Sequence, residues 1–277
     1  MKSNSDYFLV GGAHWLGDSL QDPRLSFSEG WATFFGQSTL GNADYVNGAS
    51  TFVFFDKTWQ YNIESPDASC GTPSVGNEVY NSAAMWDVVD GDNPDEVWDK
   101  VQRPFVESLF SMVDTMRNDT PDDSQGWESS TATIKDYYNQ YFSEYITPNS
   151  DSAFNFWTVF NENGMQFDSQ LPVLTITAID PPGDDEKTAR ISGTVTDNVR
   201  VKKIELYING KKIRTQDNPG DNYSFTLNEG EYRQGKNLIQ VRAYDYAGNT
   251  YTGTELRDGS YNVPHPIGRT TLSCTAL

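Results

Sequence analysis

The chain has 277 residues, of which 36% are hydrophobic and 13% aromatic, enough apolar material for two folded cores. Its net charge of −19 lies in residues 1–170, which hold 26 acidic and 7 basic side chains, while residues 171–277 hold 13 of each. We therefore expect no nucleic acid or anionic membrane as a partner, and no apolar run is long enough for a membrane span. Two cysteines, Cys70 and Cys274, exclude a disulfide framework and a cysteine-rich zinc site.

Residues 1–170 show helical spacing interrupted by polar loops, so we expect a mainly helical domain there. In SEGWATFFGQSTLG (28–41), Ser28 is a suitable N-cap, and Trp31, Phe34 and Phe35 after it fall on one side of a helix. Alternation predicts a hairpin or an extended pair over residues 51–63. Further helices are expected over 77–91, 94–116, 131–145 and 152–165, with a break before Pro104 and a C-cap at Gly164.

Short alternating runs replace the helical pattern after residue 170. They read VLTITAI, ARISGTVTD, VKKIELYING, YSFTL and NLIQVRAYD, and turn residues separate them. Such runs predict antiparallel strands, and Asn209-Gly210 predicts a type I′ hairpin turn because both positions tolerate positive φ. We expect an antiparallel β-sandwich over residues 171–263 and a tail over residues 264–277.

Two groups of acidic and amide side chains are candidate calcium ligands. Asp197, Asp245 and Asn249 stand at one end of the predicted sandwich, where they either bind Ca²⁺ or cap turns. A second group lies in MWDVVDGDNPDE (85–96) and lacks the spacing of an EF-hand loop. Its members are Asp87, Asp90, Asp92, Asn93 and Asp95. This group either binds calcium with irregular geometry or forms a helix end followed by a solvated turn.

A first resemblance concerns the sandwich. ISGTVTDNVRVKKIELYINGKKI (191–213) and GKNLIQVRAYDYAGNT (235–250) resemble the bacterial immunoglobulin-like domains that are appended to secreted enzymes and surface proteins. The resemblance implies a spacer or an appendage that binds a surface or a polymer, without chemistry of its own.

A second resemblance concerns the helical part. In this order, GGAH (11–14), SEGWATFF (28–35), NEVYNSAAMWDVVD (77–90) and FWTVFNENGMQFD (156–168) are similar to the second half of a gluzincin-type zinc peptidase domain. This family uses two histidines and one glutamate as zinc ligands, and the zinc activates a water molecule that hydrolyses a peptide bond. The resemblance implies a peptide or protein substrate and a secreted enzyme.

The resemblance also assigns roles to four residues. It makes Glu29 the third zinc ligand, with Gly30 allowing close helix packing, and it makes Asp87 a support for the metal-bearing helix from outside the ligand shell. His14 matches a position near the active site, where it would contact the substrate or a developing oxyanion. The alternative interpretation of His14 is equally good: a histidine close to two glycines can be a loop residue that hydrogen-bonds to backbone groups.

The chain departs from the family in one respect. It contains no H-E-x-x-H, and its only histidines are His14 and His265, so two zinc ligands and the general base are missing. No secretory signal stands at Met1 either. We expect that Met1 is an internal methionine and that the chain, inactive by itself, is the C-terminal portion of a secreted or cell-surface zinc peptidase. The alternative is a non-catalytic surface or adhesion protein with a degenerate peptidase-like scaffold.

Overall fold

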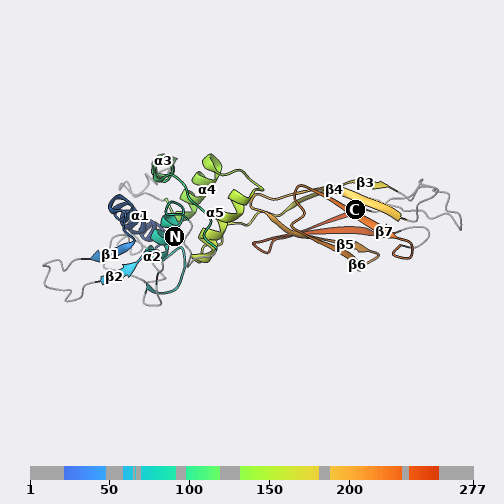
Figure 1. Cartoon of the computed structure of the whole chain (residues 1–277), viewed down its shortest axis with the longest axis horizontal. Helices are drawn as coiled ribbons and strands as arrows, with labels where there is room; N and C mark the ends of the chain where they lie inside the picture. The colour runs from blue at the N-terminus through green and yellow to red at the C-terminus, as the bar shows by residue number, and fades with distance from the viewer. Residues whose placement is uncertain are drawn as a thin grey trace, which may run out of the picture. The chain divides into compact units, whose positions relative to one another are not determined.

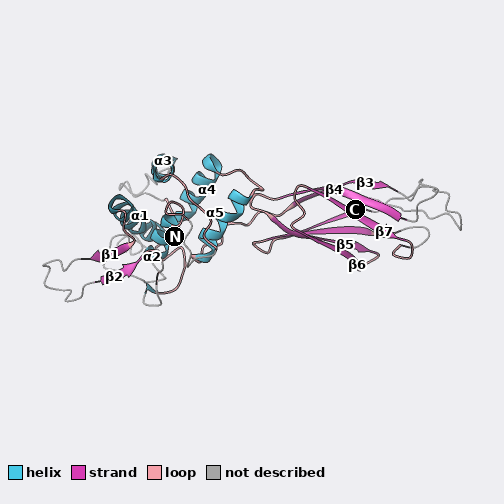
Figure 2. Cartoon of the chain, in the orientation of Figure 1, coloured by secondary structure: helices cyan, strands magenta, loops and turns pink. Residues whose placement is uncertain are grey.

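The computed structural model describes residues 22–47, 59–64, 66, 70–91, 98–118, 132–180, 188–232 and 237–255. The chain divides into two compact units (Figure 1, Figure 2). The helical unit comprises Met1–Thr147 and Ser152–Phe167, and the sandwich unit comprises Pro148–Asp151 and Asp168–Leu277. None of the described helices combines the length and the apolar character needed to cross a membrane.

Helix α1 (Pro23–Leu40) begins earlier than the sequence pattern predicts. Its N-cap is Asp22, whose Oδ1 accepts a hydrogen bond from the backbone N–H of Arg24 at 2.9 Å. Pro23 occupies the start of the helix, where the missing N–H costs nothing. The prediction of Ser28 as N-cap is wrong, because the Asp22-Pro23 pair starts the helix upstream and leaves Ser28 exposed inside it.

The other helices among the described residues follow the predicted order. They are α2 (Glu78–Trp86), α3 (Phe105–Asn118), α4 (Ile134–Tyr145) and α5 (Asp151–Glu162). The predicted helix over 94–116 is correct only after Pro104, since the described residues 98–104 are not helical. Gly164 has φ of 78°, and Met165 N–H donates to Phe160 O at 2.8 Å, which confirms the predicted C-cap of α5.

A two-stranded antiparallel pair accompanies these helices, formed by β1 (Asp44–Asn47) and β2 (Trp59–Asn62). The predicted extended segment over 51–63 therefore pairs its end with an upstream strand, which the local alternation did not indicate. Residues 51–58 lie outside the described ranges.

Aromatic side chains dominate the core of the helical unit. The rings of Tyr141 and Phe156 stack with centroids 5.0 Å apart and planes inclined by 15°, which joins α4 to α5. Further buried rings extend this cluster into α1 and along α4 and α5. They are Phe27, Phe34, Tyr137, Tyr138 and Phe160. Cys70 is also buried in this core, and Cys274 lies outside the described residues.

The sandwich unit consists of two antiparallel sheets, as predicted. One sheet has the order β3-β4-β7 and the other the order β6-β5-β8-β9. The strands are β3 (Val173–Asp180), β4 (Thr188–Thr196), β5 (Val201–Ile208), β6 (Lys211–Asp217), β7 (Asn222–Asn228), β8 (Ile239–Asp245) and β9 (Thr250–Glu255).

Alternate residues of these strands form an aliphatic core, in which Ile191, Ile204, Leu206 and Val241 are fully buried. The hairpin between β5 and β6 turns at Asn209 and Gly210, whose φ values of 51° and 81° confirm the predicted turn.

Candidate functional site

Glu29 is exposed on α1, while the residue after it is buried against α2. A Cβ atom at Gly30 would lie 2.8 Å from Asn81 Cβ and 2.8 Å from the backbone oxygen of Glu78. Only glycine therefore permits this approach of the two helices, as the sequence predicts. The contact fixes α1 on α2 and leaves the Glu29 carboxylate accessible. His14, the predicted catalytic residue, lies outside the described residues.

Asp87 is 2% exposed and caps the C-terminal end of α2. Its Oδ2 accepts a hydrogen bond from Asn163 Nδ2 at 2.8 Å, and the same amide donates to Val159 O at 2.9 Å. Asp87 therefore ties α2 to the end of α5. Its predicted role in supporting a metal-bearing helix stays a prediction.

Asp90 belongs to an acidic group that the sequence pattern did not reveal. Burial raises the pKa of Asp90 to about 8, and a hydrogen bond with Glu64 and the charge of Asp99 add to the effect. A carboxyl with this pKa is protonated at neutral pH. Asp92, Asn93 and Asp95, with which Asp90 was grouped in the sequence, lie outside the described residues.

Three aspartates converge at the end of the sandwich where β3 begins. Asp168 precedes β3, Asp197 follows β4 and Asp245 ends β8. One carboxylate oxygen from each lies within 4.8 Å of the others, and all three residues are buried. The described residues bring together no other group of three such side chains. We call these residues the aspartate triad.

Each aspartate of the triad also holds its own turn. The Oδ1 of Asp168 accepts a hydrogen bond from the N–H of Gln170 at 3.1 Å. The Oδ1 of Asp197 accepts from Val199 N–H at 2.9 Å, and that of Asp245 accepts from Asn249 N–H at 2.7 Å. The turn-capping role predicted for Asp197 and Asp245 is thus confirmed.

The sequence did not identify Asp168 as a member of this group. The sequence feature that could have identified Asp168 is its position shortly before the first strand of the sandwich. The start of β3 and the ends of β4 and β8 meet at one edge of the fold, so a residue before β3 lies near Asp197 and Asp245. Asn249, by contrast, contributes its backbone N–H to Asp245, and its side-chain amide faces the backbone oxygen of Asp168 at 3.5 Å.

The electrostatics of the triad are unfavourable for three charged groups. Burial, followed by the charge of Asp168, raises the pKa of Asp197 to about 6. The pKa of Asp168 is also raised by burial, and the charge of Asp245 adds to this effect.

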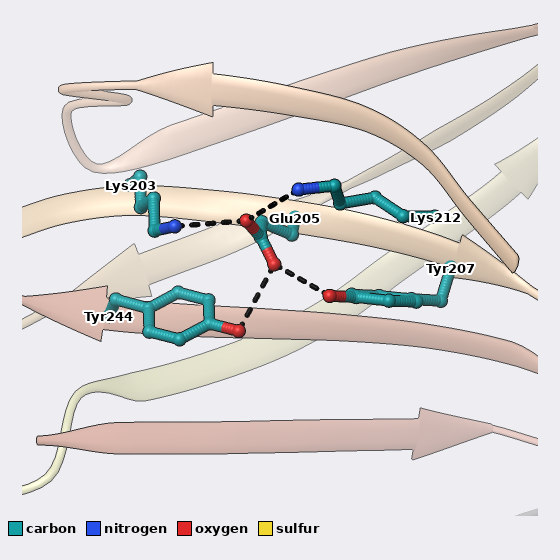
Figure 3. Close-up of polar contacts among 5 residues, drawn as sticks. All are labelled: Lys203, Glu205, Tyr207, Lys212 and Tyr244. Carbon is teal, nitrogen blue, oxygen red and sulfur yellow. Dashed lines mark hydrogen bonds and ion pairs between the residues drawn. The ribbon is translucent and has the colours of Figure 1, made fainter. Parts of the chain in front are cut away.

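A buried glutamate lies on the outer face of the second sheet (Figure 3). Glu205 on β5 is 3% exposed, and its Oε1 accepts hydrogen bonds from Lys203 Nζ at 2.9 Å and Lys212 Nζ at 3.2 Å. Its Oε2 accepts from Tyr207 Oη at 2.7 Å and Tyr244 Oη at 3.0 Å. Four donors from three strands thus surround one carboxylate.

This network stabilises the charged form of Glu205. Burial alone would raise the pKa of Glu205, but the hydrogen bonds from Tyr207, Lys203 and the other donors outweigh it and lower the pKa to about 2. Because the carboxylate is fully hydrogen-bonded within the sheet, the arrangement locks three strands together and leaves no oxygen of Glu205 for a ligand.

Comparisons with known proteins bear on the sandwich unit. No curated protein matches the chain. Among solved structures, fibronectin(III)-like modules of CbhA from Clostridium thermocellum are similar at 18% identity and a TM-score of 0.24, over 30% of this chain and 44% of that one. An FMN-binding beta-glucuronidase from Facaelibacterium prausnitzii L2-6 is similar at 16% identity and a TM-score of 0.21, over 36% of this chain and 13% of that one.

The chain therefore spans less than half the length of either structure, and scores this low carry no functional argument. The match to a family model is a firmer result, and this match covers no residue of the helical unit. The gluzincin resemblance of that unit thus stays a prediction. Residues 172–263 match the family described as the bacterial Ig domain, in agreement with their two-sheet fold.

Proposed function

We propose that this chain acts outside the cell as part of a zinc-dependent peptidase, with the helical unit contributing a ligand and the sandwich unit serving as an accessory binding module. Bacterial Ig domains are commonly extracellular or surface-located, which supports the location. The peptidase assignment draws its support from the helical unit.

The observation that carries the proposal is the placement of Glu29. Gly30 packs α1 against α2 so closely that a single added carbon would collide, and Glu29 stays exposed beside that contact. A metal ligand needs such a combination of a rigid backbone and an accessible carboxylate. In the sequence motif, Ser28 and Trp31 flank these two residues, as the resemblance to the zinc peptidases requires.

Among the described residues, Glu29 can serve as one ligand of a zinc site, but these residues do not form a complete zinc site. Catalytic zinc takes three protein ligands, most often histidine with carboxylate or thiolate groups. The group of three potential ligands that the described residues do bring together belongs to the sandwich unit. Glu29 can therefore bind zinc only with residues outside the described ranges, and peptide hydrolysis depends on those partners.

The alternative function is a non-catalytic surface protein in which the helical unit is a scaffold. The burial of Asp87 and its hydrogen bond to Asn163 favour this function, since they give Asp87 a structural role that needs no metal. The same sandwich unit would then bind a surface or a polymer without any attached chemistry.

Zinc content separates the two functions. We would purify the protein as its source organism produces it, with Glu29→Gln introduced in the gene, and measure bound zinc and hydrolysis of a peptide mixture. The peptidase proposal expects about one equivalent of zinc in the wild type and a loss of more than about tenfold in both readouts on Glu29→Gln.

The matched control is Glu162→Gln, at an exposed glutamate of α5, which should change neither readout. Zinc content at the wild-type level in Glu29→Gln would remove Glu29 from any metal site. Wild-type protein without zinc or hydrolysis would favour the scaffold function.

A further inference from the structure

The aspartate triad combines deep burial with missing hydrogen bonds. Asp168, Asp197 and Asp245 are 8%, 6% and 1% exposed. The Oδ2 atom of each is buried and receives no hydrogen bond from any described residue. A buried carboxylate oxygen without a partner is costly. Because one carboxylate oxygen of each aspartate also lies within 4.8 Å of the other two, the group needs an external partner.

The hydrogen bonds at the other oxygens direct these atoms. Each Oδ1 is engaged by a backbone N–H of the following turn, at 3.1, 2.9 and 2.7 Å for Asp168, Asp197 and Asp245. The carboxylates therefore cannot turn away from one another without breaking these turns. The Oδ2 atoms are thus held in place before any ligand arrives, which reduces the entropic cost of binding one.

The chemistry of the donors identifies the class of ligand. All three are carboxylate oxygens, and no nitrogen or sulfur ligand belongs to the group. Oxygen-only sets select hard cations such as Ca²⁺ and Mg²⁺ over zinc or copper. The ligands come from three turns with irregular spacing, which suits the flexible coordination of calcium better than the strict octahedron of magnesium.

We propose that Asp168, Asp197 and Asp245 bind one calcium ion through their Oδ2 atoms, at the end of the sandwich unit where β3 begins. The divalent charge offsets most of the charge of three carboxylates and satisfies their three buried oxygens. Calcium thereby joins the entry to β3, the exit of β4 and the exit of β8.

This inference is independent of the zinc proposal, because every ligand belongs to the sandwich unit. Extracellular modules bind calcium with dissociation constants of about 10⁻⁴ to 10⁻³ M, and we expect the triad to bind calcium in this range. Calcium would then act as a structural element that stabilises the unit where calcium is abundant.

The first test titrates CaCl₂ into the chelator-treated full chain by calorimetry and compares thermal unfolding with and without 10 mM CaCl₂. For the wild type we expect binding in the range above and a rise of about 5–15 °C in the midpoint of the sandwich unit. An equal concentration of MgCl₂ should give a smaller rise. If CaCl₂ neither binds nor raises the midpoint, the proposal is overturned and protons neutralise the triad.

The second test uses Asp245→Asn. The amide oxygen can still accept the hydrogen bond from Asn249 N–H, so the turn is retained. Without calcium the variant should be at least as stable as the wild type, because one repelling charge is gone. With calcium it should lose most of the midpoint rise and at least tenfold in affinity. Calcium-free destabilisation with an unchanged calcium effect would contradict the proposal.

Asp217→Asn, at an exposed aspartate of β6, serves as the control and should keep the full calcium effect. Should Asp245→Asn fold poorly, Asp168→Asn tests the same site from another element, with the same expected loss.

Discussion

The two units bury carboxyl groups in different ways, although both belong to one acidic chain. In the helical unit, Asp90 shares a hydrogen bond with Glu64 and keeps its proton. In the sandwich unit, Glu205 stays charged because four donors surround it. In the aspartate triad, the Oδ2 atom of each residue receives no hydrogen bond from the described residues, which is why we assign the triad a cation. Burial alone does not decide whether a carboxyl is neutral, paired or metal-bound; the surrounding donors decide it.

The cores differ in composition as well. Stacked rings such as Tyr141 on Phe156 join the helices, whereas small aliphatic side chains such as Ile204 and Val241 fill the space between the sheets. The helical unit is thus held together mainly by contacts between aromatic rings, and the sandwich mainly by contacts between aliphatic side chains.

The largest effect is expected where two helices touch through a glycine. In Gly30→Ala, the new Cβ would meet the backbone oxygen of Glu78 at 2.8 Å, and backbone cannot move aside cheaply. We expect a loss of about 2–3 kcal/mol in the unfolding free energy of the helical unit, measured by urea denaturation.

Gly36→Ala is the matched control in the same helix. Its Cβ would meet no atom within 4 Å, so the higher helix propensity of alanine should stabilise the unit by about 0.5–1 kcal/mol. Equal effects of the two substitutions would show that α1 does not pack on α2 as described.

Effects of intermediate size are expected from the pH dependence of stability, which should have opposite sign for Asp90 in the helical unit and Glu205 in the sandwich unit. The pKa of Asp90 is raised to about 8 in the folded state, so its contribution to stability is present at low pH and is lost as pH rises from about 4 to about 8. We expect Asp90→Asn to stabilise the helical unit relative to the wild type by at least about 1 kcal/mol at pH 9, and not at pH 4.

Glu205 should show the opposite dependence. Its pKa is lowered to about 2, so its contribution is present above about pH 4.5 and is lost as pH falls toward 2. Glu205→Gln should cost the sandwich unit about 1–3 kcal/mol at pH 7, with the difference shrinking below pH 4.5. The exposed Asp180→Asn provides the baseline, and denaturant unfolding between pH 2 and pH 9 measures all three variants. A pH-independent difference for Glu205→Gln would mean that the network does not hold a charge.

The smallest effect concerns the start of α1. Asp22→Ala removes the cap of Arg24 N–H and should cost the helical unit about 1 kcal/mol in thermal or urea unfolding. Ser28→Ala, inside the helix and exposed, should be neutral or slightly stabilising. The reverse ranking would restore Ser28 as the N-cap.

Local patterns determined much of the fold. Alternation and turn residues predicted the sandwich, including the Asn209-Gly210 turn, because a strand with one buried face carries its period in its own sequence. Gly164 marked the end of α5, since its positive φ is a local requirement. The start of α1 was misplaced because two capping signals stood close together, and the upstream one combined aspartate with proline.

Tertiary structure alone decided which distant side chains meet. Glu205 is an ordinary polar position in an alternating strand until β6 and β8 place Lys212 and Tyr244 beside it. Asp168, Asp197 and Asp245 are three separate turn residues in the sequence, and only the sheet topology brings the start of β3 and the ends of β4 and β8 to one edge. A sequence encodes the period and the turns of each strand locally, but the distance between two carboxylates depends on how strands far apart in the chain pair and stack.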